Sequence, residues 1–134
     1  IPKAQALFKA EEWAEKISMS NLTNQKATRL SRGEKQKLAL ARALITRPEM
    51  LFLDEPSASL DGQTTLEIER LLNSSLQLGT TIMMSTHDIG QAKRLANNIL
   101  FLNAGKLESI QSAKEFFKKP KATAARKFIA GDIV

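Results

Sequence analysis

The sequence predicts an α/β fold with a mostly parallel sheet and flanking helices. Two apolar runs, 50–53 (MLFL) and 80–85 (TTIMMS), are predicted strands, and a helical pattern follows each of them. Strand–helix–strand alternation is typical of a parallel sheet covered by helices. Polar groups come directly after both runs, and ligands of such sheets bind at the carboxyl ends of the strands.

The first part of the chain is predicted to be helical. Apolar residues recur at three- and four-residue steps from Lys3 to Ile17, which indicates an amphipathic helix. The polar stretch 18–28 is expected to be a surface connection. A second helix is predicted over 34–46, where Lys, Gln, Leu and Ala dominate, and Pro48 prevents it from continuing.

The strand predicted at 50–53 is a continuous apolar run between two prolines, which leave too little room for a helix. Runs of this kind are typical of strands buried on both faces. Asp61 or Gly62 is expected to cap a helix over 63–78 that Gly79 ends. The residues expected to point inward from that helix are Leu66, Ile68, Leu71, Leu72 and Leu76.

The last third of the chain is predicted to contain a hairpin and short helices. A helix is expected over 89–96 and a strand over 98–102. The turn at 103–105 favours pairing of that strand with 106–110. A short helix is expected from Ser112 to Phe117, and a last one after Pro120.

Composition limits the classes of protein that fit. The chain has 134 residues, enough for one domain, no cysteine, and a net charge of +6. No apolar run approaches the roughly 20 residues of a membrane span, and we expect a cytoplasmic protein. One Trp and no Tyr argue against a nucleic-acid surface. Basic residues cluster near the C-terminus; a solvated helical face is the favoured interpretation, with a phosphate-rich ligand or an anionic membrane as alternatives.

Two adjacent carboxylates, Asp54 and Glu55, follow the first strand. A carboxylate in this place is suited to hold Mg²⁺ near a nucleotide phosphate, usually through a water molecule. Side chains alternate along a strand, so Glu55 is expected to point elsewhere, where it can accept a proton from an attacking water. A turn whose acids merely cap nearby groups is an equal alternative on these residues alone.

Two further positions are candidates for phosphate binding. Ser31 and Gly33 stand at a predicted helix start, where free N–H groups favour an anion, although an ordinary helix cap is the better interpretation of these two residues alone. His87, the only histidine, follows the second strand and is expected at the same sheet edge as Asp54. A structural role is the more common one for such a histidine, but it could also bond a phosphate or the attacking water.

Together, these pieces resemble the C-terminal half of the nucleotide-binding domain of ATP-binding cassette (ABC) ATPases. LSRGE (30–34) resembles the signature motif LSGGQ, MLFLDE (50–55) the Walker B strand, SASLD (57–61) the D-loop, and THD (86–88) the switch-histidine segment. The resemblance implies a partial P-loop NTPase core. It divides the chain into a helical signature part (about 1–48), a core (about 49–111) and C-terminal helices (about 112–134).

The resemblance also implies a mechanism in which two domains stack head to tail around two ATP molecules. Asp54 would hold Mg²⁺ on the chain's own nucleotide, while Glu55 and His87 would be catalytic. The positions that would face the partner's nucleotide, or communicate across the dimer, are Ser31, Arg32, Gly33, Glu34 and Asp61.

The partners implied by the resemblance are a second ATP-binding subunit, transmembrane permease subunits and a solute-binding protein, with no nucleic acid. The implied function is ATP-driven solute transport, import rather than export. The implied location is cytoplasmic and peripheral, on the inner face of the cell membrane.

The sequence departs from the family pattern in several places. Arg32 replaces the first signature glycine and could not adopt a positive φ cheaply. Glu34 replaces glutamine, and Ala58 and Ser59 are swapped relative to the usual order. No G-x-x-x-x-G-K-[ST] motif occurs. We therefore expect a C-terminal portion of the domain that exposes an unpaired sheet edge and is inactive without the P-loop half.

Two other functions remain open at this point. The chain could be a non-catalytic module that dimerises or docks on a membrane subunit. It could also belong to the ATPase head of a DNA-repair or chromosome-structure protein, although no heptad coiled coil accompanies it.

Overall fold

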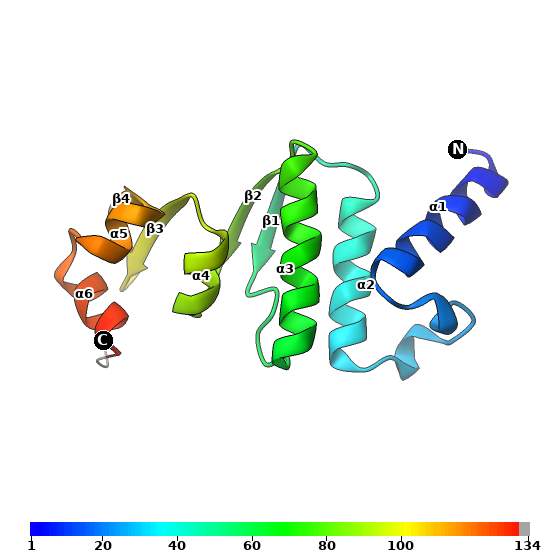
Figure 1. The fold of residues 1–134 in the computed structure, drawn as a ribbon, viewed down its shortest axis with the longest axis horizontal. Coiled ribbons are helices and arrows are strands. Elements are labelled where there is room, and N and C mark those ends of the chain that lie inside the picture. The colour runs from blue at the N-terminus through cyan, green and yellow to red at the C-terminus, as the bar shows by residue number, and fades with distance from the viewer. Residues whose placement is uncertain (132–134) are drawn as a thin grey trace. The chain divides into compact units, whose positions relative to one another are not determined.

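The computed structural model describes residues 1–131, which form two compact units (Figure 1). The first unit is Ile1–Ser85, and the second begins at Thr86. No helix in the described part of the chain is long and apolar enough to cross a membrane.

The first unit begins with two helices. Helix α1 is Lys3–Lys16, as predicted, and α2 is Arg32–Leu44, which begins two residues before its predicted start. The connection between them contains two short 3₁₀ turns, Ser20–Leu22 and Ala27–Arg29. A small core joins these segments: Ile17, Met19, Leu30 and Ala41 are buried, with Trp13, Leu22, Leu38 and Leu71 packed against them.

The two predicted strands pair in parallel, which confirms the predicted sheet type. Strand β1 is Met50–Asp54 and β2 is Thr81–Ser85. Their register runs from Met50 opposite Thr81 to Asp54 opposite Ser85, so both strands end at the same edge. A hydrogen bond from Thr80 Oγ1 to the carbonyl of Pro48 (2.9 Å) fixes the other end of the pair.

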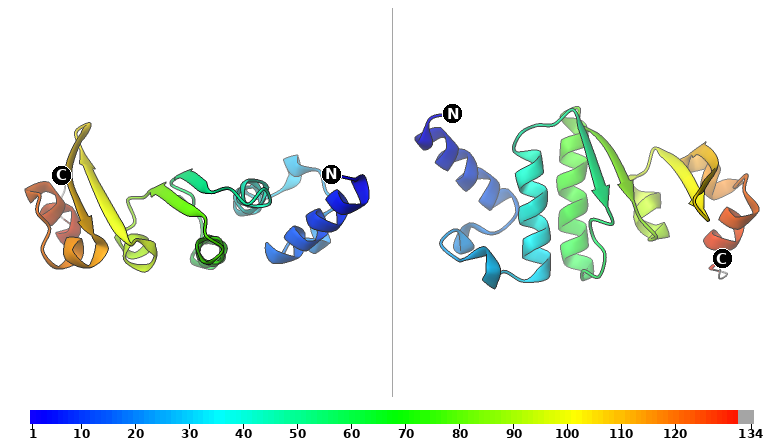
Figure 2. Two further views of the ribbon diagram at one scale, coloured as in Figure 1. Left: turned by 90° about the horizontal axis from the view of Figure 1, so that it is seen from above. Right: turned by 180° about the vertical axis from the view of Figure 1, so that it is seen from behind.

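Helix α3 (Gly62–Gln77) lies on one side of the two strands (Figure 2). Asp61 caps its start, and Gly79, with φ +95°, follows its end as predicted. Ile68 is buried, but Leu66 is 43% exposed, so its predicted inward position is wrong. Residues two positions apart lie on opposite sides of a helix, and therefore these two side chains cannot share one face.

The strands are not buried on both faces, contrary to the prediction. Leu51 is buried, whereas the side chains of Met50, Phe52 and Met83 are 48%, 66% and 43% exposed. Alternation and register place these three residues on one face of the pair. Among the described residues of the first unit α3 covers the opposite face, and this apolar face remains open.

The second unit is built around a hairpin. Strands β3 (Asn98–Asn103) and β4 (Lys106–Ser112) pair antiparallel, as predicted. Ala104 and Gly105 form the turn with φ of +45° and +74°, the combination that a two-residue type I′ turn requires. The helices of this unit are α4 (Ile89–Leu95), α5 (Ala113–Lys118) and α6 (Thr123–Ala130).

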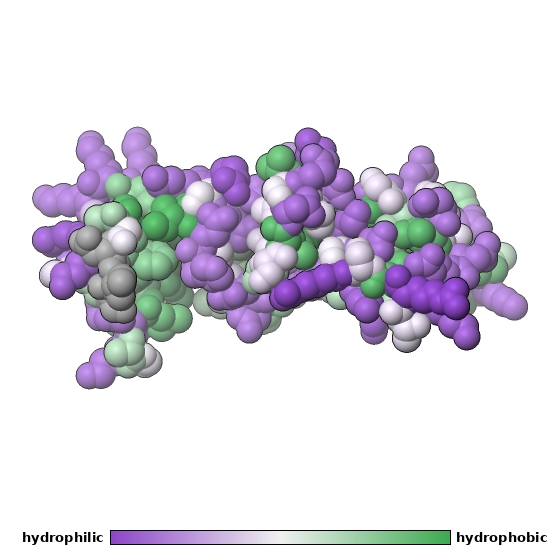
Figure 3. Space-filling view, turned by 90° about the horizontal axis from the view of Figure 1, so that it is seen from below, coloured by the Kyte–Doolittle hydropathy of each residue, from purple (hydrophilic) through white to green (hydrophobic). Residues whose placement is uncertain are grey.

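Aromatic packing joins the hairpin to the last two helices. The ring of Phe101 lies 5.8 Å from that of Phe116 and 6.1 Å from that of Phe128, measured between centroids. On the face shown in Figure 3, apolar residues lie in separate patches between hydrophilic ones. Of the three clustered rings, that of Phe116 is buried, and those of Phe101 and Phe128 are partly exposed.

A buried side-chain amide fixes the chain where α5 gives way to α6. Gln111 Nε2 donates to the carbonyl of Lys119 (3.1 Å), and Gln111 Oε1 accepts from the N–H of Lys121 (2.9 Å). Pro120, between these residues, has no N–H. One amide thus satisfies backbone groups on both sides of the proline.

Candidate functional site

The carboxyl end of β1 brings Asp54 beside Ser85. These residues face each other in the strand register, and Ser85 Oγ donates a hydrogen bond to Asp54 Oδ1 (2.5 Å). Both residues are exposed, on the open face of the sheet. The structure therefore places a carboxylate, held by a hydroxyl, at the edge where the sequence predicts it.

Glu55 has a backbone conformation unusual for a residue with a side chain. Its φ is +44°, in the left-handed region, which costs about 1–2 kcal/mol for a residue other than glycine. Two acceptors hold its N–H: Ser85 Oγ at 3.0 Å and the carbonyl oxygen of Ser85 at 3.2 Å. The turn after β1 is thus fixed by the last residue of β2.

The candidate metal site rests on one protein carboxylate. Within residues 1–131 no group of three or more His, Cys, Asp or Glu side chains converges to hold a metal ion. Mg²⁺ commonly takes one or two carboxylates and fills its other positions with water and phosphate oxygens. The chemistry of Asp54 fits that mode of binding.

The predicted phosphate-binding helix start is a complete capping box. The N–H of Glu34 donates to Ser31 Oγ (3.3 Å), and the N–H of Ser31 donates to Glu34 Oε2 (2.7 Å). The Ser31 backbone and side chain hold the pKa of the Glu34 carboxyl below its ordinary value. Phosphate oxygens accept hydrogen bonds, so a phosphate contact there would use the Ser31 hydroxyl as a donor while its oxygen accepts from Glu34.

Arg32 does not need the left-handed backbone that its position in the motif suggested. It is the first residue of α2, and its side chain is exposed. Gly33, next to it, is where space is limited: a Cβ there would lie 3.0 Å from Thr64 Cγ2 on α3. The second glycine of this motif therefore allows α2 and α3 to approach closely.

Asp61 is engaged as the cap of α3. Its Oδ1 accepts from the N–H of Thr64 (2.9 Å) and its Oδ2 from Thr64 Oγ1 (2.7 Å). These bonds, the backbone one first, hold the pKa of the Asp61 carboxyl below its ordinary value. Thr64 also lies directly beside Gly33. It therefore links the Asp61 cap of α3 to the start of α2.

One turn further along, an ion pair joins the same two helices. Lys37 Nζ lies 2.8 Å from Glu67 Oε2, and Gln63 Nε2 donates to Glu67 Oε1 (3.2 Å). The Lys37 side chain is only 10% exposed. The hydrogen bond from Lys37 is the main cause that lowers the pKa of Glu67.

His87 belongs to the second unit and is exposed. The neighbouring Asp88 is fixed: its N–H donates to Thr86 Oγ1 (3.0 Å), and its Oδ1 accepts from the N–H of Gln91 at the start of α4 (2.9 Å). These two hydrogen bonds fix Asp88 relative to Thr86 and to the start of α4, on either side of His87.

A sequence model of the family described as "ABC transporter" matches residues 3–58. The arginine transport ATP-binding protein ArtM of Bacillus subtilis is 35% identical over 127 residues, which are 95% of this chain and 53% of that protein. The phosphate import ATP-binding protein PstB of Thermotoga maritima is 39% identical over 129 residues, 96% of this chain and 50% of that protein. The chain spans about half the length of these relatives.

Solved structures agree with these sequence matches. The dimeric structure of MJ0796, a bacterial ABC transporter cassette, matches 84% of this chain and 49% of that chain, with a TM-score of 0.75 and 30% identity. These matches identify the chain as part of an ABC-type ATPase domain. The cassette MJ1267, at 24% identity and a TM-score of 0.78, supports the fold over 94% of the chain.

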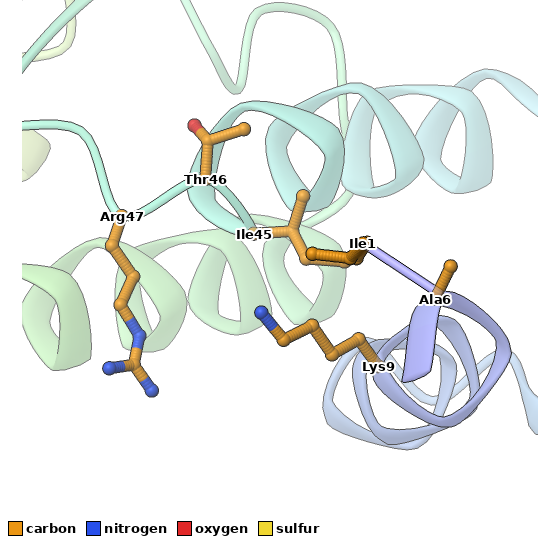
Figure 4. A pocket seen from close by; sticks show the side chains of 6 residues that line it. All are labelled: Ile1, Ala6, Lys9, Ile45, Thr46 and Arg47. Carbon is orange, nitrogen blue, oxygen red and sulfur yellow. The ribbon is translucent and has the colours of Figure 1, made fainter. Parts of the chain in front are cut away.

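A surface pocket of this partial ABC domain is lined by residues outside the motifs. It has a volume of about 470 Å³, between the beginning of the chain and the end of α2 (Figure 4). Two cationic side chains contribute to its wall. The lining residues are Ile1, Ala6, Lys9, Ile45, Thr46 and Arg47, none of which the sequence motifs include.

Sequence reasoning missed four residues that support the motifs of the ABC domain: Lys37, Thr64, Glu67 and Ser85. Three of them act between α2 and α3, and local patterns do not reveal which side chains of two helices meet. Ser85 had a visible signal. It is a hydroxyl residue at the end of an apolar strand, directly before the segment that contains the only histidine.

Proposed function

We propose that the chain is part of the ATP-binding subunit of an ABC importer, which couples ATP binding and hydrolysis to solute transport. The observation that carries this proposal is the position of Asp54 and Glu55 at the carboxyl end of two parallel strands. The relatives support it, since those reported above are named as ATP-binding proteins of transport or import systems.

The chain's own nucleotide would be served by three residues. Asp54 would hold Mg²⁺ through a water molecule, and the ion would neutralise phosphate charge. Glu55 would accept a proton from the attacking water, and His87 would support that geometry. Asp54 and Glu55 are adjacent and share Ser85 as a hydrogen-bond partner, so the proton acceptor and the metal ligand would be oriented together.

A partner's nucleotide would be met by the start of α2. The N-terminus of this helix favours phosphate through its N–H groups and its dipole. The exposed side chain of Arg32 adds a cation at this end, which suits a triphosphate. In this proposal the partner-facing residues are Ser31, Arg32, Gly33 and Glu34, with Asp61 communicating across a head-to-tail dimer.

The remaining partners follow from the same proposal. They are transmembrane permease subunits and a solute-binding protein, with the ATP-binding subunit on the cytoplasmic face of the membrane. The two relatives reported above are named for arginine and phosphate. These solutes differ in charge and size, and the proposal therefore assigns no particular solute.

Hydrolysis in this proposal needs a P-loop from outside the 134 residues, which contain none. The test compares the chain alone with the chain mixed with a separately produced P-loop half of a relative. We expect no hydrolysis above background from the chain alone, and Mg²⁺-dependent hydrolysis from the mixture that Glu55→Gln abolishes. Robust hydrolysis by the chain alone, lost in Glu55→Gln, would contradict the need for a P-loop from outside the chain. Restored hydrolysis that survives Glu55→Gln would contradict the role of Glu55.

The open apolar face of β1 and β2 favours a second function, association without catalysis. Met50, Phe52 and Met83 are large apolar residues that water contacts on this face. A chain that uses this face for docking would self-associate or bind a partner in the absence of nucleotide. Light scattering separates the alternatives, because a monomer at high concentration argues against association driven by this face.

A further inference from the structure

Ser85 contacts both members of the Asp54–Glu55 pair. Its hydroxyl donates to Asp54 Oδ1 at 2.5 Å and accepts from the N–H of Glu55 at 3.0 Å. A hydroxyl has one donor and two acceptor lone pairs, so both bonds can exist at once.

The bond to Asp54 determines how its carboxylate is presented. It occupies Oδ1, so Oδ2 is the oxygen that a water of a bound cation would reach. A carboxylate on an exposed strand end otherwise samples several rotamers, and a donor from the neighbouring strand selects one of them. Orientation of a metal ligand by such a partner is a common requirement for tight metal binding.

The bond to Glu55 determines the direction of the chain after the strand. The left-handed backbone of Glu55 persists only where surrounding groups stabilise it, and the hydroxyl and carbonyl of Ser85 both accept its N–H. Among the other residues of β2, Ile82, Met83 and Met84 have no hydroxyl, and Thr81 lies opposite Met50 at the far end of the strand pair.

We propose that Ser85 is a positioning residue, which orients the Asp54 carboxylate toward a divalent cation and fixes the backbone that presents Glu55. This inference rests on the proposed function, since it assumes that Asp54 binds the cation. It differs from that function by assigning a role to a residue outside the family motifs quoted above. In the absence of Ser85 Oγ, both acids remain but their relative orientation is lost.

The test uses the 134-residue chain with Mn²⁺ as the probe. Binding of Mn²⁺ is measured by the broadening of the NMR signals of the Asp54 and Glu55 amides. The variants are Ser85→Ala, Ser85→Thr and Asp54→Asn, with Ser74→Ala as a matched loss of a hydroxyl elsewhere in the first unit. Ser85→Ala should weaken Mn²⁺ binding about tenfold, and Ser85→Thr, which keeps the hydroxyl, should stay within about twofold. Hydrogen exchange of the Glu55 amide with solvent should be about tenfold faster in Ser85→Ala and unchanged in the other variants.

The outcomes separate the two proposals. If Asp54→Asn abolishes the broadening while Ser85→Ala binds Mn²⁺ like the unsubstituted chain, the positioning role of Ser85 is wrong and the metal role of Asp54 stands. If the unsubstituted chain shows no broadening, or if Asp54→Asn retains it, the metal role of Asp54 is wrong. The proposal that Ser85 orients a metal ligand is then wrong as well. A Ser85→Thr variant that behaves like Ser85→Ala would show that the hydroxyl is not the cause.

Discussion

Lys37 Nζ lies 2.8 Å from Glu67 Oε2 and thereby joins α2, which follows the signature motif, to α3, which follows the D-loop. Thr64 reinforces this junction one turn earlier, between Gly33 and Asp61. The segment proposed to face a partner's nucleotide and the segment proposed to communicate across the dimer are therefore connected within the chain. A substitution at the start of α2 should therefore affect the start of α3, and the reverse.

Lys37→Met tests the strength of this junction. It keeps an unbranched apolar side chain of similar length but leaves the partly buried Glu67 without its cation, and should lower the free energy of unfolding by about 1–3 kcal/mol. Lys35→Met, at an exposed position of the same helix, is the control and should change it by less than about 0.5 kcal/mol. Urea unfolding measures both. Equal effects would mean that the ion pair adds nothing particular.

The pH dependence of stability should reflect the same pair. Because Lys37 lowers the pKa of Glu67, the folded chain binds fewer protons than the unfolded chain in the acid range. The stabilisation should be complete above the ordinary glutamate pKa of about 4.3 and should be lost as the pH falls through the lower folded value. Lys37→Met should flatten this acid slope in urea unfolding measured from pH 7 downward. An unchanged slope would exclude the pair as its source.

Gly33→Ala tests the close approach of the two helices. The new Cβ would lie 3.0 Å from Thr64 Cγ2, and the bonds of Thr64 to Asp61 limit its movement. We expect a loss of about 1–2 kcal/mol in stability, despite the better helix propensity of alanine. Adding Thr64→Ser removes the methyl group, keeps the hydroxyl and should recover most of the loss. A double variant no more stable than Gly33→Ala would locate the strain elsewhere.

Ser31 combines a structural and a proposed binding role, and two substitutions separate them. Ser31→Ala removes the cap and should cost about 1 kcal/mol of stability. Ser31→Asp retains a good cap and should fold as stably as the unsubstituted chain. Its negative charge should nevertheless weaken any interaction with phosphate. Thermal unfolding checks the first effect, and nucleotide-dependent dimerisation with a complete ABC domain checks the second.

The open sheet face predicts a measurable tendency to associate. Phe52→Thr removes its most exposed large side chain and keeps a good strand former, and should shift the chain toward monomer in light scattering. Leu78→Thr, which removes an 81% exposed leucine at the end of α3, is the matched control and should not. Equal effects of both substitutions would point to general hydrophobicity rather than to this face.

Much of the fold could be predicted because its signals are local. Gly79 ends α3, Ser112 begins α5, and the turn at 103–105 sets the hairpin, each through the conformational preference of one or two residues. The apolar run 50–53 also identified a strand. It gave no information on which face is covered, so the exposure of Phe52 was not predicted.

The candidate site was predictable only in part, for a similar reason. Asp54 and Glu55 are recognised by their place after a strand, but the role of Ser85 depends on the register between strands about thirty residues apart. The strain expected at Arg32 does not arise, since the capping box places this residue inside α2. The roles in nucleotide chemistry stay predictions for all the site residues: Ser31, Arg32, Gly33, Glu34, Asp54, Glu55, Asp61 and His87.

The amide of Gln111 makes the C-terminal helices sensitive to a very small genetic change. A single base substitution converts a glutamine codon to a glutamate codon, and the two side chains have nearly the same shape. A carboxylate still accepts from Lys121, but it cannot donate to the carbonyl of Lys119 and places two acceptors face to face. A mutation that looks conservative by size would therefore be selected against at this buried position.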